Sequence, residues 1–314
     1  MQSSPKRIFI STSTFGKYDA SPLEKLRKSG YAVEVNPYGR KLTVDEQLKL
    51  YKGIDGLIAG TESLNGDVLK SLPGLRVISR CGVGLDNVDL DAAERLGISV
   101  HNTPDAPTLA VAELTVALIL NLLRKTGRMT SALAGGKWKK EMGNLVHGKR
   151  IGIIGFGRIG QKVAELLSGF GAELTYCDVE DKGCVVNCER KGLEEILGWA
   201  DIITLHLSVS GDSGVVIGEK ELKKMRKGTW LINLSRGGAV DEEALYMLLK
   251  DGYLEGAALD VFGQEPYIGP LVGLENALLT PHVGSYAREA RIRMENEAVD
   301  NLLADLVGRD QRET

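Results

Sequence analysis

Cysteine is scarce in this chain of 314 residues, which has four thiols, at positions 81, 177, 184 and 188. No two of them form a Cys-x-x-Cys pair, and the closely spaced Cys184 and Cys188 have no histidine nearby to complete a metal site. We therefore expect four reduced thiols in a cytoplasmic protein that holds no metal ion.

A strong charge of one sign and long hydrophobic runs are also missing. The formal net charge of −3 gives no reason to expect nucleic acid or an anionic membrane as a partner. The most apolar run, from Thr115 to Leu123, is too short to span a bilayer and adjoins Glu113 and Arg124, so it predicts a buried helix. The first residues contain no apolar stretch followed by a cleavage site, which argues against a secretory signal.

The chain does contain a regular alternation of strand-like and helix-like segments. Its length predicts two domains, and 43% apolar and 26% charged residues are ordinary for a soluble globular protein. The alternation is typical of βαβ units and parallel sheets, so we expect two doubly wound α/β domains. The predicted strands cover residues 7–12, 31–35, 56–60, 75–80, 97–101, 150–154, 173–179, 201–207, 229–235, 256–262 and 277–282. The predicted helices cover residues 21–30, 43–53, 89–97, 109–134, 160–171, 193–200, 219–228, 241–252 and 285–307.

A glycine pattern, Gly155-x-Gly157-x-x-Gly160, lies between the predicted strand 150–154 and the helix that follows it. Such glycines permit a tight turn, close approach of a pyrophosphate and close packing of helix on strand. The N-terminus of that helix offers backbone N–H groups, including those of Arg158 and Ile159, to phosphate oxygens. In this context the pattern predicts a dinucleotide site; the alternative is a glycine turn that binds no ligand.

The next predicted strand ends at Asp178. A carboxylate at this place can accept hydrogen bonds from the adenosine ribose hydroxyls and repels a 2′-phosphate. The sequence therefore predicts NAD as the cofactor, in preference to NADP.

Polar side chains also follow three later predicted strands, and open α/β sheets bind their ligands at these strand ends. Arg236 follows the strand 229–235, Glu265 follows 256–262, which contains Asp260, and His282 comes at the end of 277–282. A single histidine after a strand is more often structural than catalytic, but the three stretches together predict a reaction site.

Six motifs that occur in a fixed order along the chain indicate a particular protein family. They are GVGLDNVDLDAA, NTPDAPTLAVAELT, GKRIGIIGFGRIG, NLSRGGAVDEEAL, ALDVFGQEP and TPHVGS, between about Leu75 and the end of the chain. With them, the chain resembles the D-isomer-specific 2-hydroxyacid dehydrogenase family, and within it the short-form D-3-phosphoglycerate dehydrogenases.

The resemblance implies roles for the site residues. Arg236 would bind the substrate carboxylate and carbonyl oxygen, and its forked guanidinium suits a planar carboxylate. His282 would be the general acid/base on the C2 oxygen, and Glu265 would orient it and favour its protonated form. The implied substrate contacts on a separate loop are Arg80, Gly82, Val83 and Gly84. The implied cofactor contacts are Gly155, Gly157, Arg158, Ile159, Gly160, Asp178, His206, Ser208, Ser235, Asp260 and Gly284, with Asp260 on the nicotinamide amide.

The resemblance also implies a domain organisation. A flavodoxin-like substrate-binding domain would comprise residues 1–101 and the returning helix in 285–314, and a Rossmann NAD-binding domain, residues 102–284, would be inserted between them. The two connections would form a hinge, with the active site in the cleft, and a homodimer is expected.

Several departures bear on the substrate. The sequence ends at Thr314, so we expect no C-terminal regulatory domain and no serine feedback. Arg80 matches a basic position of the phosphoglycerate enzymes, but Ala59 and Glu62 stand where those enzymes commonly place an arginine, and Ser208 replaces a usual proline. The favoured function is that of an NAD-dependent D-2-hydroxyacid dehydrogenase, which transfers hydride between C2 of the substrate and NAD, with 3-phosphoglycerate and 3-phosphohydroxypyruvate as the favoured substrate pair, in serine biosynthesis. The alternatives are a reductase of glyoxylate, hydroxypyruvate or another 2-oxoacid, and a non-enzymatic NAD(H)-sensing, corepressor-like protein.

Overall fold

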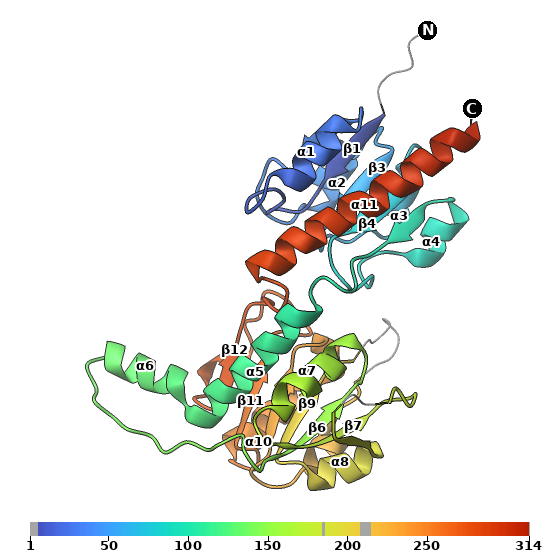
Figure 1. Cartoon of the computed structure of the whole chain (residues 1–314). Coiled ribbons are helices and arrows are strands. Elements are labelled where there is room, and N and C mark those ends of the chain that lie inside the picture. Colours follow the sequence, from blue (N-terminus) through green and yellow to red (C-terminus); the bar gives the residue numbers. More distant parts are fainter. Residues whose placement is uncertain (1–5, 184–185, 208–214, 314) are drawn as a thin grey trace. The chain divides into compact units, whose positions relative to one another are not determined.

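The computed structural model describes residues 6–183, 186–207 and 215–313, and it divides the chain into two compact units (Figure 1). Unit 1 comprises Met1–Pro107 and Ser285–Thr314, and unit 2 comprises Thr108–Gly284. The first boundary thus lies after Pro107, whereas the sequence predicted it after His101. The difference arises because the connecting segment stays hydrogen-bonded within unit 1: Thr103 N–H donates to Gly82 O, at 3.0 Å, and the Asn102 side chain donates to Val83 O, at 2.7 Å.

Unit 1 is built on a five-stranded parallel sheet, and each strand lies within a predicted one. The strands are β1 (Arg7–Ile10), β2 (Ala32–Val35), β3 (Gly56–Ala59), β4 (Val77–Arg80) and β5 (Ser99–His101). Their order in the sheet is β2-β1-β3-β4-β5, which is the flavodoxin-like order that the resemblance implies.

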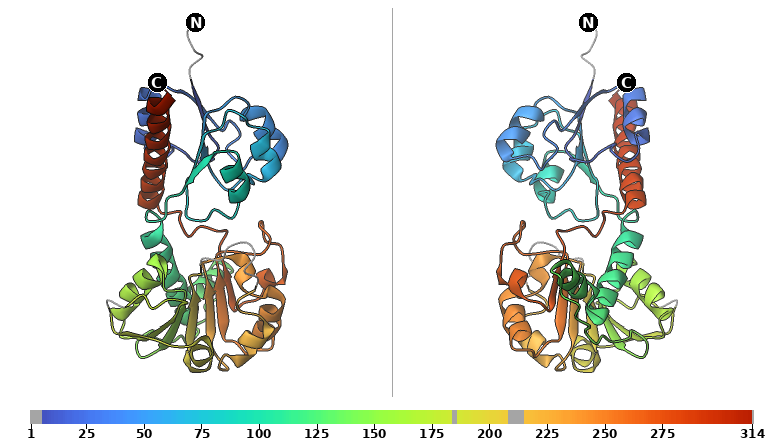
Figure 2. Two further views of the ribbon diagram at one scale, coloured as in Figure 1. Left: turned by 90° about the vertical axis from the view of Figure 1, so that its right-hand side faces the viewer. Right: turned by 90° about the vertical axis from the view of Figure 1, so that its left-hand side faces the viewer.

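Helices cover both faces of this sheet. Figure 2 shows α1 (Ser21–Lys28) and α11 (Arg288–Glu313) on one face, with α2 (Val44–Leu50), α3 (Gly66–Lys70) and α4 (Leu90–Arg95) on the other. The sequence analysis did not predict α3, a short helix of five residues. It predicted α11 from Ser285 to Val307, and the helix instead begins at Arg288 and extends to Glu313.

No strand comes after the final helix in the described chain, and this helix completes the core of unit 1. Leu302 and Leu306 are fully buried among Ile8, Ile10 and the other residues of that core. At Gly56 of β3, an added Cβ would lie 3.3 Å from Leu302 and 3.2 Å from Leu306, so α11 packs directly on the backbone of the sheet.

Unit 2 contains a seven-stranded parallel sheet. The strands are β6 (Arg150–Ile154), β7 (Glu173–Cys177), β8 (Cys188–Arg190), β9 (Ile202–Leu205), β10 (Trp230–Asn233), β11 (Gly256–Leu259) and β12 (Ala277–Leu279). Their order is β12-β11-β10-β9-β6-β7-β8, the doubly wound order of dinucleotide-binding domains with one further strand at the edge. The short strand β8 is not among the predicted strands.

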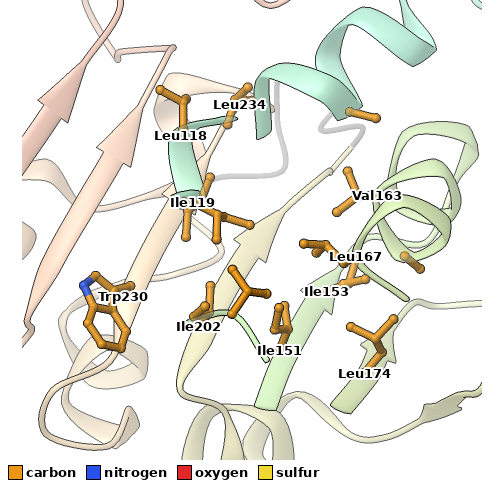
Figure 3. Close-up of a cluster of buried hydrophobic side chains, with 14 of the residues drawn as sticks. Leu118, Ile119, Ile151, Ile153, Val163, Leu167, Leu174, Ile202, Trp230 and Leu234 are labelled. Carbon is orange, nitrogen blue, oxygen red and sulfur yellow. The ribbon is translucent and has the colours of Figure 1, made fainter. Parts of the chain in front are cut away.

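Two helical layers sandwich this sheet. One contains α5 (Thr108–Arg124) and α7 (Arg158–Ser168), and Figure 3 shows Leu118, Ile119, Val163 and Leu167 from these helices above the strand residues Ile151 and Ile153. The other contains α8 (Leu193–Trp199), α9 (Glu219–Lys224) and α10 (Glu242–Lys250), and two short 3₁₀ helices, Gly237–Ala239 and Pro270–Gly273, follow β10 and precede β12. No helix in the described part of the chain is long and apolar enough to cross a membrane.

The single helix predicted over 109–134 is wrong, because the structure has two helices, α5 and α6 (Thr126–Ala134). The break falls at Lys125, which adopts a left-handed conformation with φ of 54°. Hydrogen bonds made by two asparagines stabilise this break. Asn144 N–H donates to Leu123 O, at 2.8 Å, and satisfies the end of α5, while Asn121 Oδ1 accepts the Gly127 N–H, at 2.9 Å, at the start of α6.

Candidate active site

The loop between β6 and α7 needs glycine at two of its three pattern positions. Gly155 has φ of 87°, and an added Cβ would lie 2.4 Å from His206 O. A Cβ on Gly160 would lie 2.2 Å from Gly155 O, because the first turn of α7 packs against the strand end. Gly157 borders open space instead, with no atom within 4 Å of an added Cβ. The three glycines thus match the three roles of a dinucleotide loop.

The N-terminus of α7 is arranged to receive an anion. Its N-cap residue is Gly157, which offers no side chain to accept hydrogen bonds from the first turn. The backbone N–H groups at Arg158, Ile159 and Gly160 therefore sit at the positive end of the helix dipole, beside the open side of the loop. This arrangement fits the pyrophosphate of a dinucleotide.

Asp178 lies at the end of β7, next to the glycine loop, and one of its oxygens holds that loop. Its Oδ2 accepts the Phe156 N–H at 2.6 Å, and its Oδ1 accepts the Glu180 N–H at 3.1 Å. The Phe156 ring stacks on Tyr176 of β7, with the ring centroids 3.9 Å apart, which fixes the same loop from the other side. Each carboxylate oxygen keeps a second lone pair that can accept from a ribose hydroxyl.

His206 and Ser235 follow β9 and β10 and are both buried. His206 Nε2 lies 2.9 Å from Thr204 Oγ1, and burial lowers the pKa of the imidazole to about 3, so the ring is neutral. Ser235 donates its hydroxyl to Asn233 Oδ1, at 2.7 Å, so it can serve a cofactor as an acceptor. Ser208, the remaining predicted contact of this kind, lies outside the described residues.

The structure brings the predicted acid/base pair together. His282 Nδ1 lies 2.9 Å from Glu265 Oε2 and 3.1 Å from Oε1. The histidine side chain is 53% exposed, and its Nε2 has no hydrogen bond to any described residue. The imidazole can therefore exchange a proton through Nε2 while the carboxylate orients it through Nδ1.

Asp260 anchors the segment that carries this histidine, a role that the sequence analysis did not foresee. It is 1% exposed, and its Oδ1 accepts from Thr280 Oγ1, at 2.6 Å, and from Val283 N–H, at 2.8 Å. Its Oδ2 accepts the Gly284 N–H at 2.8 Å. Between these contacts His282 adopts φ of 53°, so the turn that presents the imidazole is held by one buried carboxylate.

Arg236 lies on a loop that packs against the loop of Glu265. A Cβ at Gly237 would fall 1.9 Å from the Phe262 carbonyl carbon, so the two backbones touch and only glycine fits. Phe262 N–H in turn donates to Glu265 Oε1, at 3.2 Å. Arg236 is half-buried and its Nη1 donates to Ser235 O, at 2.9 Å. Arg236, Glu265 and His282 thus follow the neighbouring strands β10, β11 and β12.

The predicted substrate loop lies in unit 1, after β4, and its glycine is structural. Gly82 has φ of 152°, and its N–H donates to Thr103 Oγ1, at 2.8 Å, so it is not available to a carboxylate as the resemblance implied. In the part of the chain that the structure describes, the N–H groups of Val83 and Gly84 make no hydrogen bond, and they remain candidates. A Cβ at Gly82 would fall 1.1 Å from Arg80 Nη1, because the guanidinium lies across the glycine and donates to Cys81 O, at 3.0 Å.

Glu62 is buried among uncharged hydrogen-bond donors. It is 2% exposed and accepts from Tyr51 Oη, at 3.1 Å, from Gly60 N–H, at 3.1 Å, and from Ser11 Oγ. Among residues 6–183, 186–207 and 215–313 it forms no ion pair with Arg80. Glu62 is an internal support of the loop after β3.

The described cysteines show no disulfide and no metal cluster. Cys81, Cys177 and Cys188 take part in no disulfide, and burial raises the pKa of Cys81 to about 11. Within the described ranges, no three His, Cys, Asp or Glu side chains converge in a way that could hold a metal ion.

The chain is similar in sequence to known proteins. Residues 116–284 match the family described as D-isomer specific 2-hydroxyacid dehydrogenase, NAD binding domain. A glyoxylate reductase of Thermococcus gammatolerans is 38% identical over 291 residues, covering 87% of this chain and 86% of that protein. A glyoxylate reductase of Pyrococcus horikoshii is 37% identical over 294 residues, covering 89% of this chain and 88% of that protein.

Solved structures agree in fold. A protein of Thermus thermophilus superposes with a TM-score of 0.90 at 37% identity, over 96% of this chain and 97% of that one. A glyoxylate reductase from Paecilomyes thermophila gives a TM-score of 0.85 at 26% identity, over 96% of this chain and 95% of that one. The two relatives and the Paecilomyes structure are named glyoxylate reductases, so the favoured assignment to phosphoglycerate dehydrogenase and serine biosynthesis finds no support in them. The chain belongs to the D-isomer-specific 2-hydroxyacid dehydrogenase family and is an NAD-dependent oxidoreductase that acts on CH–OH groups.

Proposed function

We propose that the protein reduces a small unphosphorylated 2-oxoacid, glyoxylate or hydroxypyruvate, to the 2-hydroxyacid. The observation that carries this proposal is the pair formed by His282 and Glu265, in which Nδ1 is held and Nε2 is left for substrate. The names of the relatives support the substrate class, since the two described above by identity are glyoxylate reductases.

The chemistry follows from the residues present. The Gly155–Gly160 loop and Asp178 would hold NADH, which would provide the hydride for C2 of the oxoacid. His282 donates a proton from Nε2 to the C2 oxygen, which becomes the hydroxyl, and regains a proton from water. Glu265 orients the ring through the contact at Nδ1, and Arg236 binds the substrate carboxylate through its forked N–H groups. Val83 and Gly84 are the proposed backbone donors to the same carboxylate.

A phosphorylated oxoacid, 3-phosphohydroxypyruvate, is the second candidate, and Arg80 is the residue that favours it. Its guanidinium lies at the predicted substrate loop, directly over Gly82. The neighbouring loop adds no second cation, because it carries Ala59 and the buried carboxyl of Glu62. A phosphate normally needs more positive charge than one arginine supplies beside a carboxylate, so the unphosphorylated substrates are favoured.

Steady-state NADH oxidation with glyoxylate, hydroxypyruvate and 3-phosphohydroxypyruvate tests the proposal. We expect higher kcat/KM on the first two. His282→Ala should lower kcat by roughly 10²–10⁴-fold on each substrate while the Kd for NADH stays within about two-fold, because the imidazole contacts substrate oxygen and not the dinucleotide.

His101→Ala is the matched control, since His101 Nε2 also lies 2.8 Å from a carboxylate, that of Asp305, but in unit 1. Its rate should stay near that of the unmodified enzyme. Near-normal turnover by His282→Ala would overturn the acid/base assignment. A preference for 3-phosphohydroxypyruvate that Arg80→Ala abolishes would select the second candidate.

A further inference from the structure

A cation that the sequence analysis did not single out lies beside Asp178. Arg190 ends β8, the strand absent from the predictions, and β8 pairs with β7 so that Arg190 stands opposite Tyr176. Its Nη2 donates to Asp178 O, at 2.9 Å, and to Val179 O, at 3.2 Å. The guanidinium thus holds the backbone of Asp178, the residue that is expected to bind the adenosine ribose.

The donors of Arg190 are only partly used. An arginine side chain has five N–H donors, and both observed bonds come from Nη2. The donors on Nε and Nη1 make no hydrogen bond to any residue that the structure describes, and the side chain is exposed to solvent. A planar pair of donors is therefore open to a ligand at the Asp178 end of the cofactor loop.

The carboxylate of Asp178 opposes this charge without neutralising it in an ion pair. Its oxygens accept from the backbone N–H groups of Phe156 and Glu180, and it forms no salt bridge to a described residue. Lys182, the nearby cation of the following loop, is bound to Glu180. At the ribose end of the site, the Asp178 carboxylate thus repels a phosphate and the Arg190 guanidinium attracts it, and Asp181, which is bound to Tyr176, is a further carboxylate within electrostatic range of Arg190.

We propose that Arg190 is a second determinant of cofactor choice, a built-in ligand for a 2′-phosphate that Asp178 masks. With Asp178 ionised, the guanidinium holds the turn at Asp178–Val179 and a 2′-phosphate is repelled. Once the carboxylate charge is removed, the Nε and Nη1 donors bind the 2′-phosphate of NADP(H) through charge-assisted hydrogen bonds. The preference for NAD then depends on the balance between two opposite charges and not on Asp178 alone.

Equilibrium binding without substrate tests this assignment. Asp178→Asn removes the charge but keeps an oxygen that can accept the Phe156 N–H, so the loop is preserved. Titration calorimetry would give the Kd of NADH and NADPH for the unmodified protein, Asp178→Asn, Arg190→Ala and the double variant. We expect Asp178→Asn to bind NADPH at least ten-fold more tightly than the unmodified protein, and the double variant to lose most of this gain, roughly ten- to a hundred-fold.

Two controls make the result specific. Lys191→Ala removes the neighbouring cation, whose ammonium lies over the Trp199 ring, 5.5 Å from its centroid, and should leave the NADPH affinity of Asp178→Asn unchanged. Raising salt should weaken NADPH binding to Asp178→Asn more steeply than to the double variant. Arg190→Ala and Lys191→Ala should bind NADH within a few-fold of the unmodified protein, and matching circular dichroism spectra and thermal unfolding should confirm that the Asp178→Asn variants are folded.

Equal NADPH affinity of Asp178→Asn and the double variant would overturn the proposal, as would an equal loss on replacing Lys191. A failure to reduce any 2-oxoacid would count against the proposed function only, because these measurements contain no substrate.

Discussion

His206 keeps a neutral imidazole inside unit 2, and this makes the stability of the unit depend on pH. The ring is buried after β9, and burial lowers its pKa from 6.5 to about 3. Between these values the unfolded chain binds a proton that the folded chain excludes, so acid favours unfolding. The stabilising contribution is complete above about pH 6.5 and decreases as the pH falls toward 3.

His206→Gln should therefore flatten the pH dependence of stability. For each pH unit below about 6, the free energy of unfolding of the unmodified protein should fall by up to about 1.4 kcal/mol more than that of the variant. Urea unfolding of both proteins at several pH values between about 4.5 and 7.5 would measure the difference. Parallel curves would mean that the folded state accepts a proton on this ring.

Lys125 separates α5 from α6, and its left-handed conformation is the unfavourable feature of this element pair. A residue with a Cβ destabilises the folded state by roughly 1–2 kcal/mol when its backbone is left-handed, and glycine avoids this cost. We expect Lys125→Gly to raise the free energy of unfolding by about 1 kcal/mol. The substitution also removes the ion pair between the Lys125 ammonium and the Glu255 carboxylate, 3.9 Å apart, which reduces this gain slightly.

The matched control for this substitution is Arg124→Gly, one residue earlier in the last turn of α5. There the backbone is right-handed, so glycine should lower the free energy of unfolding by roughly 0.8–1 kcal/mol. Thermal unfolding of both variants measures the contrast. If both variants lost stability alike, the left-handed residue would carry no strain.

At the scale of the whole molecule, the two units have separate cores. The last helix of the chain, α11, completes the core of unit 1. Leu302 of α11 is fully buried in unit 1, while Val307 on the same helix is 45% exposed. Leu302→Ala should destabilise unit 1 by about 2–5 kcal/mol, whereas Val307→Ala should have little effect. The predicted homodimer stays a prediction.

Calorimetry with and without NADH separates the units. NADH at about 100 times its Kd should stabilise unit 2 by roughly 2.7 kcal/mol. We expect Leu302→Ala to lower a thermal transition that NADH does not raise. If the substitution lowered the same transition that NADH raises, the two units would unfold together.

Local sequence patterns were sufficient for much of the fold and for part of the site. Strands and helices alternate because apolar periodicity is a local property, and all but one of the observed strands lie within predicted ones. The glycine spacing identified the loop of Gly155 and Gly160, since a backbone that approaches another this closely excludes a Cβ. Parallel strands end at one edge of a sheet, so a shared site for the polar residues after these strands followed from the order of motifs, whereas the contact between Glu265 and His282 was implied by the family resemblance.

Only the tertiary structure decided the features that depend on partners distant in the chain. The break at Lys125 depends on Asn144, whose N–H donates to Leu123 O from a distant part of the sequence. The residues next to the break contain no pattern that predicts it. Asp260 proved to be the anchor of the His282 turn because burial brings three donors to one carboxylate. Arg190 reaches Asp178 only because β8 adds to the edge of the sheet, and a three-residue strand is too short for its periodicity to be recognised. The sequence by itself therefore determined the family and the class of chemistry and predicted residues for it, while the tertiary structure decided which groups hold those residues in place.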